Sequence, residues 1–503
     1  MTEPSIQIIR TDVLVIGGGA SGLAAAIEAA RLGSRVIVLE QAAETGGMMN
    51  WAVGTVSAVN TPQQKRAAIA DTTQAHFEDL AVHAGSLAAR DNLALRQLLT
   101  THTPDMMTWL LDLGIVFVGP TLDPPQRVAR MHNVVPSARS FAFHLTRACT
   151  RAGVDIRLAT SCKELIEENG RIVGANAGTH MGKMLRFLAR QGVILATGDY
   201  SGASDLKSAF GASDVADVEP VANTSTGDGY RLGMDLGATV ANGDIVRGPI
   251  MRFVPPRKTN FVQKIPPFQL VGSAIAWAMR IVPQWILRPF LMKFLTTVLG
   301  PSPTLFSNGA ILINREGRRF TDELRGPAAD VARQPEKEAY IVFDQNLATK
   351  FSAWPHFVST APGIAYAYID DYRRCRKDIF CSASTMDELA RRLGVPSAQF
   401  RATLQQYNTA DRGTRAPIAQ APFYALGPVK SYVVFTEGGL RVTERLEVLR
   451  ANGSVIEGLY AVGSVGQGGL LLEGHGHHLD WAFISGRIAG AICAAMPRRT
   501  NRV

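Results

Sequence analysis

The chain opens with two short apolar strands separated by an alanine-rich helix. Residues 13–16 are apolar and mostly β-branched, which is typical of a strand buried on both faces of a parallel sheet. Residues 20–32 are rich in alanine and favour a helix, and Gly33 is placed to end it. A second apolar run follows at residues 36–39. The pattern predicts a β–α–β unit.

Glycines interrupt this unit at a regular spacing. Gly17, Gly19 and Gly22 form a G-x-G-x-x-G pattern, and Glu40 follows the second strand. The first glycine permits a tight turn, the second lets the backbone approach a pyrophosphate, and the third allows close helix–strand packing. An acidic residue about 20 residues further on holds a ribose hydroxyl in such sites. This order of strand, glycines, helix, second strand and Glu40 predicts a dinucleotide site. A glycine-rich turn in another α/β sheet would not need an acid at the end of the second strand.

Helical and strand periodicities alternate along the rest of the chain, which indicates an α/β protein. Helices are predicted within residues 61–113 and at 230–236, 386–393, 397–407 and 479–495; strands are predicted at 154–158, 171–175, 192–196, 309–314, 318–323, 340–343 and 458–463.

Residues 265–300 differ from the rest because they are apolar on almost every side. Two helices are predicted, at 270–282 and 290–299, separated by Pro283 and Pro289. The segment is too short and too broken by proline to span a bilayer. Three interpretations stay open: a lid over an apolar substrate, an interfacial membrane anchor, or an oligomer contact.

Composition narrows the classes of protein that fit. The 503 residues are 46% hydrophobic and 19% charged, as expected of one large or two ordinary globular domains. The net charge of +9 is spread without aromatic–basic interleaving, so no nucleic acid is expected as a partner. Five scattered cysteines without a C-x-x-C pair predict reduced thiols, a cytoplasmic protein and no metal site. No signal peptide is expected, because residues 1–10 contain acid and proline and no long apolar run.

Further motifs follow the β–α–β unit in a fixed order. They are the Gly46-Gly47 loop, Ala196-Thr197-Gly198, Thr226-Gly-Asp228-Gly, the segment 308–320, Glu437-Gly-Gly, and Gly458-Leu-Tyr-Ala-Val-Gly463 with Ser485-Gly-Arg-Ile-Ala-Gly490. Together they resemble the FAD-dependent fumarate reductase and 3-ketosteroid 1-dehydrogenase superfamily over most of the chain, outside 241–307. The resemblance implies a Rossmann-like, glutathione-reductase-like FAD-binding domain at 1–240 and 430–503. An α+β capping domain at 241–429, containing the apolar insertion 265–300, would be inserted into it.

The resemblance also implies the cofactor and its contacts. FAD would be bound non-covalently, since residues 41–60 contain no histidine for covalent attachment. The residues implied to bind it are Gly17, Gly19, Ala20, Ser21, Gly22, Glu40, Gln41, Gly46, Gly47, Met48, Cys162, Ala196, Thr197, Gly198, Asp228, Gly463, Ser464, His477 and His478.

The charged residues that clamp a dicarboxylate in fumarate-reducing members are replaced in this chain. Their positions fall at or near Phe306, Pro327, Phe435 and Glu473. Without those charges, nothing would offset the desolvation of two carboxylates, so fumarate is rejected as the substrate. The two phenylalanines and the apolar insertion favour an apolar substrate, such as a cyclic ketone or a 3-ketosteroid.

The apparatus of the ketosteroid-dehydrogenating members is incomplete as well. The backbone amide that polarises the ketone corresponds to Gly476, but the two tyrosines fall near Leu472 and at Pro327. Candidates for the missing acid–base roles are Glu473, His475, Tyr432 and Arg325. A histidine could donate a proton near neutral pH. The alternatives are that His477 and His478 cap the last helix, that Tyr432 packs at a domain junction, and that Arg325 is an exposed loop residue.

These observations predict an FAD-dependent oxidoreductase acting on a CH–CH group. It would add or remove hydrogen beside a carbonyl in an apolar small molecule, with an unidentified electron acceptor or donor. The alternatives are a reductase of a monocarboxylic enoate and a membrane-docked electron-transfer flavoprotein. The expected location is cytoplasmic, with possible peripheral membrane contact through 265–300.

Overall fold

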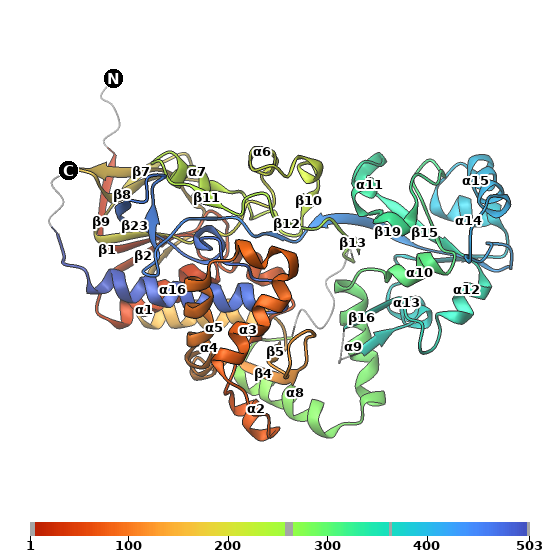
Figure 1. The fold of residues 1–503 in the computed structure, drawn as a ribbon, viewed down its shortest axis with the longest axis horizontal. Coiled ribbons are helices and arrows are strands. Elements are labelled where there is room, and N and C mark those ends of the chain that lie inside the picture. The colour runs from red at the N-terminus through yellow and green to blue at the C-terminus, as the bar shows by residue number, and fades with distance from the viewer. Residues whose placement is uncertain (1–5, 257–264, 362–364, 500–503) are drawn as a thin grey trace.

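The computed structural model describes residues 6–256, 265–361 and 365–499, and they form two lobes (Figure 1). The first lobe is built on an eight-stranded sheet whose main order is β22-β23-β8-β9-β1-β2-β6, with β7 paired to β8. The strands are β1 (Gln7–Ile16), β2 (Val36–Leu39), β6 (Asp155–Arg157), β7 (Thr160–Glu168), β8 (Arg171–Thr179), β9 (Met184–Leu195), β22 (Glu447–Leu449) and β23 (Val455–Ala461). The central strand β1 runs parallel to both β2 and β9, which confirms the predicted β–α–β unit.

Two helices from opposite ends of the chain lie together against this sheet. They are α1 (Ala20–Arg31) and α16 (His477–Ala495), which run side by side in Figure 1. A Cβ added to Gly486 or Gly490 would lie 2.3 Å from a backbone oxygen of α1, so glycine is what lets the two helices approach. The C-terminal helix therefore brings its own N-terminus to the start of α1.

Further helices and a small sheet complete the first lobe. The helices are α2 (Pro62–Arg66), α3 (Thr73–Ala84), α4 (Leu93–Asp112), α5 (Arg139–Arg151), α6 (Ser204–Ala209) and α7 (Asp228–Met234), with short 3-10 turns at Gly47–Trp51 and Gly463–Gly466. Strand β5 (Met131–Val135) pairs with both β3 (Thr55–Ser57) and β4 (Val116–Thr121). Two strand pairs, β11 (Val240–Ala241) with β21 (Gly439–Leu440) and β12 (Val246–Arg247) with β20 (Phe435–Thr436), lie near the passage to the second lobe.

The second lobe is built around the long strand β19, which leads back towards the first lobe (Figure 1). Its six-stranded sheet has the order β10-β19-β15-β14, with β13 and β18 also paired to β19. The strands are β10 (Glu219–Pro220), β13 (Ile250–Phe253), β14 (Ile311–Ile313), β15 (Ala339–Phe343), β18 (Phe380–Ala383) and β19 (Phe423–Val433). The helices are α10 (Pro303–Ser307), α11 (Ala328–Ala332), α12 (Gln345–Lys350), α13 (Ile369–Cys375), α14 (Met386–Leu393) and α15 (Ser397–Thr409), and β16 (Ser359–Ala361) pairs with β17 (Ala365–Ala367). The predicted domain boundaries stay a prediction.

Two local predictions were wrong. Residues 318–323 form no strand. Arg319 makes only an isolated bridge to Ile313 of β14, and the next free N–H of that edge, on Leu312, donates to the Glu323 carboxylate at 3.0 Å instead of to a backbone carbonyl. The second helix of the apolar insertion begins before Pro289. Helices α8 (Gln269–Ile281) and α9 (Gln284–Val298) meet at Pro283, and Pro289 lies inside α9, where it removes one backbone hydrogen bond.

Candidate functional site

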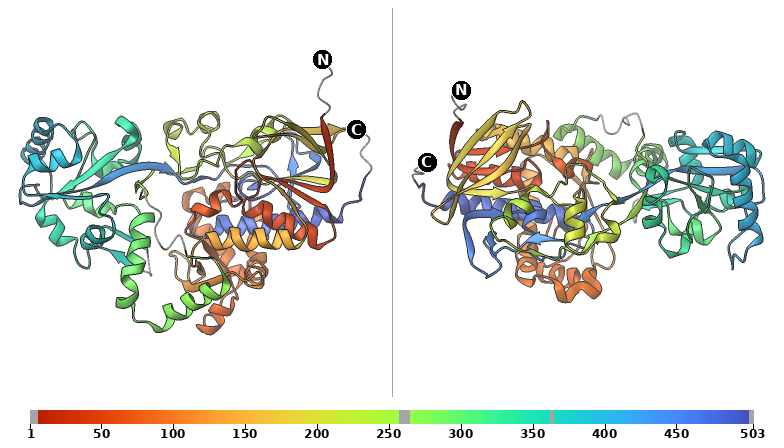
Figure 2. Two further views of the ribbon diagram at one scale, coloured as in Figure 1. Left: turned by 180° about the vertical axis from the view of Figure 1, so that it is seen from behind. Right: turned by 90° about the horizontal axis from the view of Figure 1, so that it is seen from above.

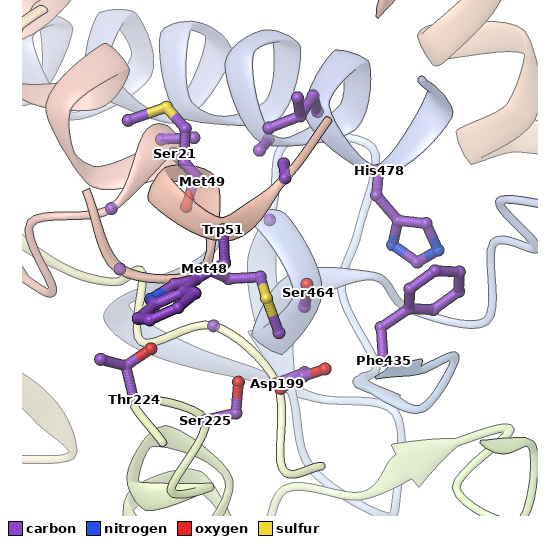
Figure 3. A pocket seen from close by; sticks show the side chains of 18 of the residues that line it. Ser21, Met48, Met49, Trp51, Asp199, Thr224, Ser225, Phe435, Ser464 and His478 are labelled. Atoms are coloured by element: carbon purple, nitrogen blue, oxygen red, sulfur yellow. The ribbon is translucent and has the colours of Figure 1, made fainter. Parts of the chain in front are cut away.

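A cavity of about 730 Å³ lies where the two lobes meet. The first lobe contributes the turn between β1 and α1, the segment 46–55, the end of β9 and the segment 473–479. The second lobe contributes Ile250, Arg252 and Leu299. Figure 3 shows one part of the wall, to which Met48, Trp51 and Ser464 contribute and where the ring of His478 lies beside that of Phe435.

The turn between β1 and α1 is built so closely that only glycine fits. Gly17 has a φ of +109°, and a Cβ on it would lie 2.3 Å from the Ala196 carbonyl oxygen. A Cβ on Gly22 would lie 1.9 Å from the Gly17 carbonyl oxygen. Gly22 does not line the cavity; it lets α1 pack against the turn. The first residues of α1, Ala20 and Ser21, face the cavity, so the positive end of this helix is available to a pyrophosphate.

Glu40 is held in place by two backbone donors. Its carboxylate accepts the Gly18 N–H at 2.7 Å and the Ala42 N–H at 2.8 Å. The residue is only 7% exposed and lines the cavity beside Gln41. A buried, oriented carboxylate at the end of the second strand is suited to accept hydrogen bonds from ribose hydroxyls. The residues present therefore fit the adenosine half of FAD.

Most of the other residues predicted to bind the cofactor line the same cavity. They are Gly19, Gly46, Gly47, Met48, Cys162, Ala196, Thr197, Gly198, Asp228, Gly463, Ser464 and His478. Burial raises the pKa of the Cys162 thiol to about 12, so it contributes a contact and no reactive thiolate. All five cysteines of the chain are free thiols.

His477 was predicted to contact the cofactor, but the structure places it inside the protein. Its Nδ1 donates to the Glu473 carbonyl oxygen at 2.6 Å, and its Nε2 lies 3.2 Å from Nε2 of His76 on α3. Burial lowers the pKa of His477 to about 3, so the ring is neutral and ties the 473–477 segment to α3. Its neighbour His478 faces the cavity because α16 turns the next side chain by about 100°. Among the described residues, no cluster has an arrangement suited to a metal ion.

His475 forms a hydrogen-bonded pair with a carboxylate, which the sequence did not reveal. Its Nδ1 lies 2.9 Å from the Asp123 carboxylate, which also accepts the His475 backbone N–H at 2.9 Å. Both residues line the cavity. The hydrogen bond to Asp123 raises the pKa of His475. His475 is therefore a candidate proton donor whose Nε2 is left for a substrate.

The glycines beside His475 keep the segment close to its neighbours. Gly476 has a φ of +101°, and a Cβ on it would lie 2.7 Å from the Ser57 nitrogen of β3. Asp480 accepts the Ser57 N–H at 3.1 Å, and Ser57 Oγ donates to the His475 carbonyl oxygen at 2.8 Å. The Gly476 backbone, which lines the cavity, is therefore held against β3 by hydrogen bonds on both sides of the residue.

Glu473 lines the cavity but is occupied by an ion pair. Arg247 contacts the Glu473 carboxylate, and its Nε also lies 2.9 Å from Glu437. Burial would raise the pKa of Glu437, but nearby His478 and Arg247 lower it to about 2. Because Arg247 already occupies the Glu473 carboxylate, Glu473 is a weaker candidate base than predicted.

Arg252 is a cavity residue that the sequence analysis missed. It lies on β13, and the cavity wall around it carries Ile250, Leu299, Val434 and Phe435. Burial lowers the pKa of its guanidinium, partly offset by the nearby Tyr432. In the described part of the chain its guanidinium makes no ion pair or hydrogen bond. The available signal was a single arginine between apolar Met251 and Phe253.

Two predicted catalytic residues are not brought to the cavity. Arg325 has an 87% exposed side chain, 3.4 Å from Asp322. Tyr432 pairs with Ile250 across β19 and β13, and burial raises its pKa, but its side chain is not part of the wall. Of the two phenylalanines taken as substrate contacts, only Phe435 faces the cavity. Phe306 is 1% exposed and packs in the core of the second lobe.

Comparisons with known proteins agree with this geometry. The chain matches the family described as "FAD binding domain" over residues 12–254 and 295–471, and it belongs to that family. The NADH:fumarate oxidoreductase of Klebsiella pneumoniae is 25% identical over 90% of this chain, which spans 44% of that relative. The probable fumarate reductase Ifc3 of Shewanella frigidimarina is 26% identical over 95% of this chain and 74% of the relative.

Two solved structures share the fold. The open conformation of a flavocytochrome c3 fumarate reductase superposes with a TM-score of 0.72, at 24% identity over 98% of this chain and 78% of that one. The 3-ketosteroid-Δ4-(5α)-dehydrogenase of Rhodococcus jostii RHA1 gives 0.60, at 22% identity over 98% of each chain. The protein is thus an FAD-dependent oxidoreductase, and it shares its fold with a fumarate reductase and a 3-ketosteroid dehydrogenase. FAD is its cofactor.

Proposed function

We propose that the protein adds or removes hydrogen across the carbon–carbon bond beside a carbonyl in an apolar substrate, such as a cyclic ketone or a 3-ketosteroid. The observation that carries this proposal is Arg252, an unpaired guanidinium in a cavity whose wall also carries the apolar residues Ile250, Leu299, Val434 and Phe435. An apolar wall fits an apolar substrate body. One cation within it fits a single oxygen on which negative charge develops during the reaction.

The same observation argues against a dicarboxylate. Two carboxylates in a partly dry cavity need several cations or donors to offset their desolvation. Arg247, the other guanidinium near this end of the cavity, is already shared by Glu437 and Glu473. Fumarate is therefore a poor fit, although relatives of the chain carry its name.

The roles of the chain's own residues follow from their contacts. Bound FAD supplies the hydride exchange with the substrate carbon. Arg252, together with the Gly476 backbone, would polarise the carbonyl oxygen. His475, held by Asp123, would exchange the proton at Nε2. FAD itself would be held without a covalent bond by the turn at Gly17 and by Glu40.

The test is anaerobic reaction of the purified holoenzyme, followed by flavin absorbance. Saturated cyclic ketones and 3-ketosteroids are added to the oxidised enzyme, and the matching enones and fumarate to the reduced enzyme. Bleaching by a ketone, or reoxidation by an enone but not by fumarate, supports the proposal. An enzyme that exchanges electrons only with a partner protein is an electron-transfer flavoprotein, and the proposal is then wrong.

A second candidate is a reductase of a monocarboxylic enoate, which Arg252 also favours. A guanidinium binds a carboxylate through two parallel hydrogen bonds, and one unpaired guanidinium matches one carboxylate. Reoxidation of the reduced enzyme by monocarboxylic enoates, with no response to ketones or enones, would select this alternative.

A further inference from the structure

Helices α8 and α9 form a projection that the rest of the fold does not require. We call residues 269–298 the α8–α9 hairpin. It forms a V at the lower edge of Figure 1, and the left view of Figure 2 shows it projecting on the same side. The family match leaves out residues 255–294, so most of the hairpin is an addition to the family fold.

The outward face of this hairpin is apolar. Leu270 is 85% exposed, Trp277 63% and Ile281 56%, and Trp285 at the start of α9 is 75% exposed. The first three are spaced by seven and four residues, so they share one face of α8. The opposite face is buried through Gly272 and Ala276, and a Cβ on Gly272 would lie 3.2 Å from Val116 of β4. A surface helix in water normally turns a polar face outward, and α8 does not.

The charged residues of the hairpin have one sign. Residues 269–298 contain no aspartate or glutamate and three basic residues, Arg280, Arg288 and Lys293. On the hairpin itself, Arg280 and Lys293 are exposed, whereas Arg288 pairs with Asp371 of α13. An apolar face with tryptophans, bordered by basic residues, is the pattern of a segment that lies in a membrane interface.

We propose that the α8–α9 hairpin is a membrane anchor that inserts Leu270, Trp277, Ile281 and Trp285 into the surface of a bilayer containing anionic lipids. No helix in the described part of the chain is long and apolar enough to cross a membrane, so the anchor lies in one leaflet. Basic residues near the headgroups add attraction to anionic lipids. Leu299 follows α9 directly and lines the cavity, so the anchor leads from the bilayer to the site. The inference does not depend on the proposed substrate.

The test is co-sedimentation of the holoenzyme with vesicles. Vesicles of phosphatidylcholine alone are compared with equal mixtures of phosphatidylcholine and phosphatidylglycerol. We expect stronger binding to the anionic vesicles and a loss of that preference at high salt. The variants Trp277→Ser and Trp285→Ser should each lower the partition coefficient about tenfold, the order expected for withholding one large apolar side chain from an apolar environment.

Matched variants separate anchoring from general effects. Met181→Ser removes an 82% exposed apolar side chain from the turn between β8 and β9 and should leave vesicle binding unchanged. Arg280→Glu should abolish the preference for anionic vesicles, whereas Arg391→Glu on α14 should not. Unchanged flavin content in each variant establishes that the fold is intact.

Three results would overturn the inference. The first is a wild-type enzyme that sediments with neither vesicle type. The second is a double variant W277S/W285S that sediments as well as the wild type. The third is a dimer, detected by light scattering, that the double variant converts to monomers without any vesicle binding; the face then belongs to a second copy of the chain.

Discussion

At the scale of single residues, the site depends on three charged groups placed in different ways. Arg252 is unpaired, His475 is held by Asp123, and Glu473 is neutralised by Arg247. A partly buried charge without a partner is costly. Arg252 therefore makes sense as a residue whose partner is the substrate.

Replacing Arg252 tests that assignment. Arg252→Met should lower kcat about a hundredfold with a ketone, the order seen when one donor to a developing oxyanion is removed. With a carboxylate substrate the larger effect should be on KM, because ground-state binding is lost as well. Steady-state kinetics on both substrate types measure the split. Arg252→Lys keeps the charge and should recover part of the activity. If both variants lose the same activity and also lose flavin, Arg252 has a structural role instead.

The pH dependence of the reaction tests His475. The Asp123 hydrogen bond raises the pKa of His475 above its usual value near 6.5. For reduction, the protonated ring is the active form, so kcat/KM should be level at low pH and fall as pH rises through this raised pKa. Asp123→Asn removes the cause and should move the fall to lower pH. If the pH profile of Asp123→Asn is the same as that of the wild type, His475 is excluded as the donor.

At the scale of elements, glycines at the contacts between α1, α16 and the β1 turn explain how the two ends of the chain share one site. Gly22 lets α1 approach the β1 turn, and Gly486 and Gly490 let α16 approach α1. The N-termini of both helices then face one cavity. Helix α16 carries His478 to it, while the preceding segment carries His475 and Gly476.

Substituting Gly22 tests the importance of this packing. Gly22→Ala places a Cβ 1.9 Å from the Gly17 oxygen, so α1 must shift. We expect a loss of about 1–3 kcal/mol of stability and weaker FAD retention, measured by thermal unfolding and by flavin content after gel filtration. Gly178→Ala on β8 is the control, since its Cβ would meet nothing nearer than 3.5 Å. Similar effects in both variants would show that the α1 contact is not special.

At the scale of the whole molecule, the cavity exists only where the two lobes meet. The first lobe supplies the surfaces that fit FAD, and the second supplies Arg252, Ile250 and Leu299. The α8–α9 hairpin spans the lower edge between them (Figure 1). The cavity thus combines the cofactor surface and His475 of the first lobe with Arg252 of the second.

The sequence alone determined the cofactor end of the site. Strand, glycine turn, helix and acid are neighbours in the chain, and their spacing sets their geometry locally, so Gly17, Ser21 and Glu40 could be placed in advance. It also predicted the unusual apolar segment at 265–300.

Only the tertiary structure decided the substrate end. His475 and Asp123 are 352 residues apart, and Arg252 reaches the cavity because β13 pairs with β19 from a distant part of the chain. Adjacency in the sequence was misleading for His477, because consecutive residues on a helix point in different directions. Contacts that form only when distant elements pack leave no periodic pattern in the sequence. The FAD cofactor and the glycine turn that lines the cavity could therefore be predicted from the sequence, whereas the Asp123 partner of His475 and the place of Arg252 in the cavity could not.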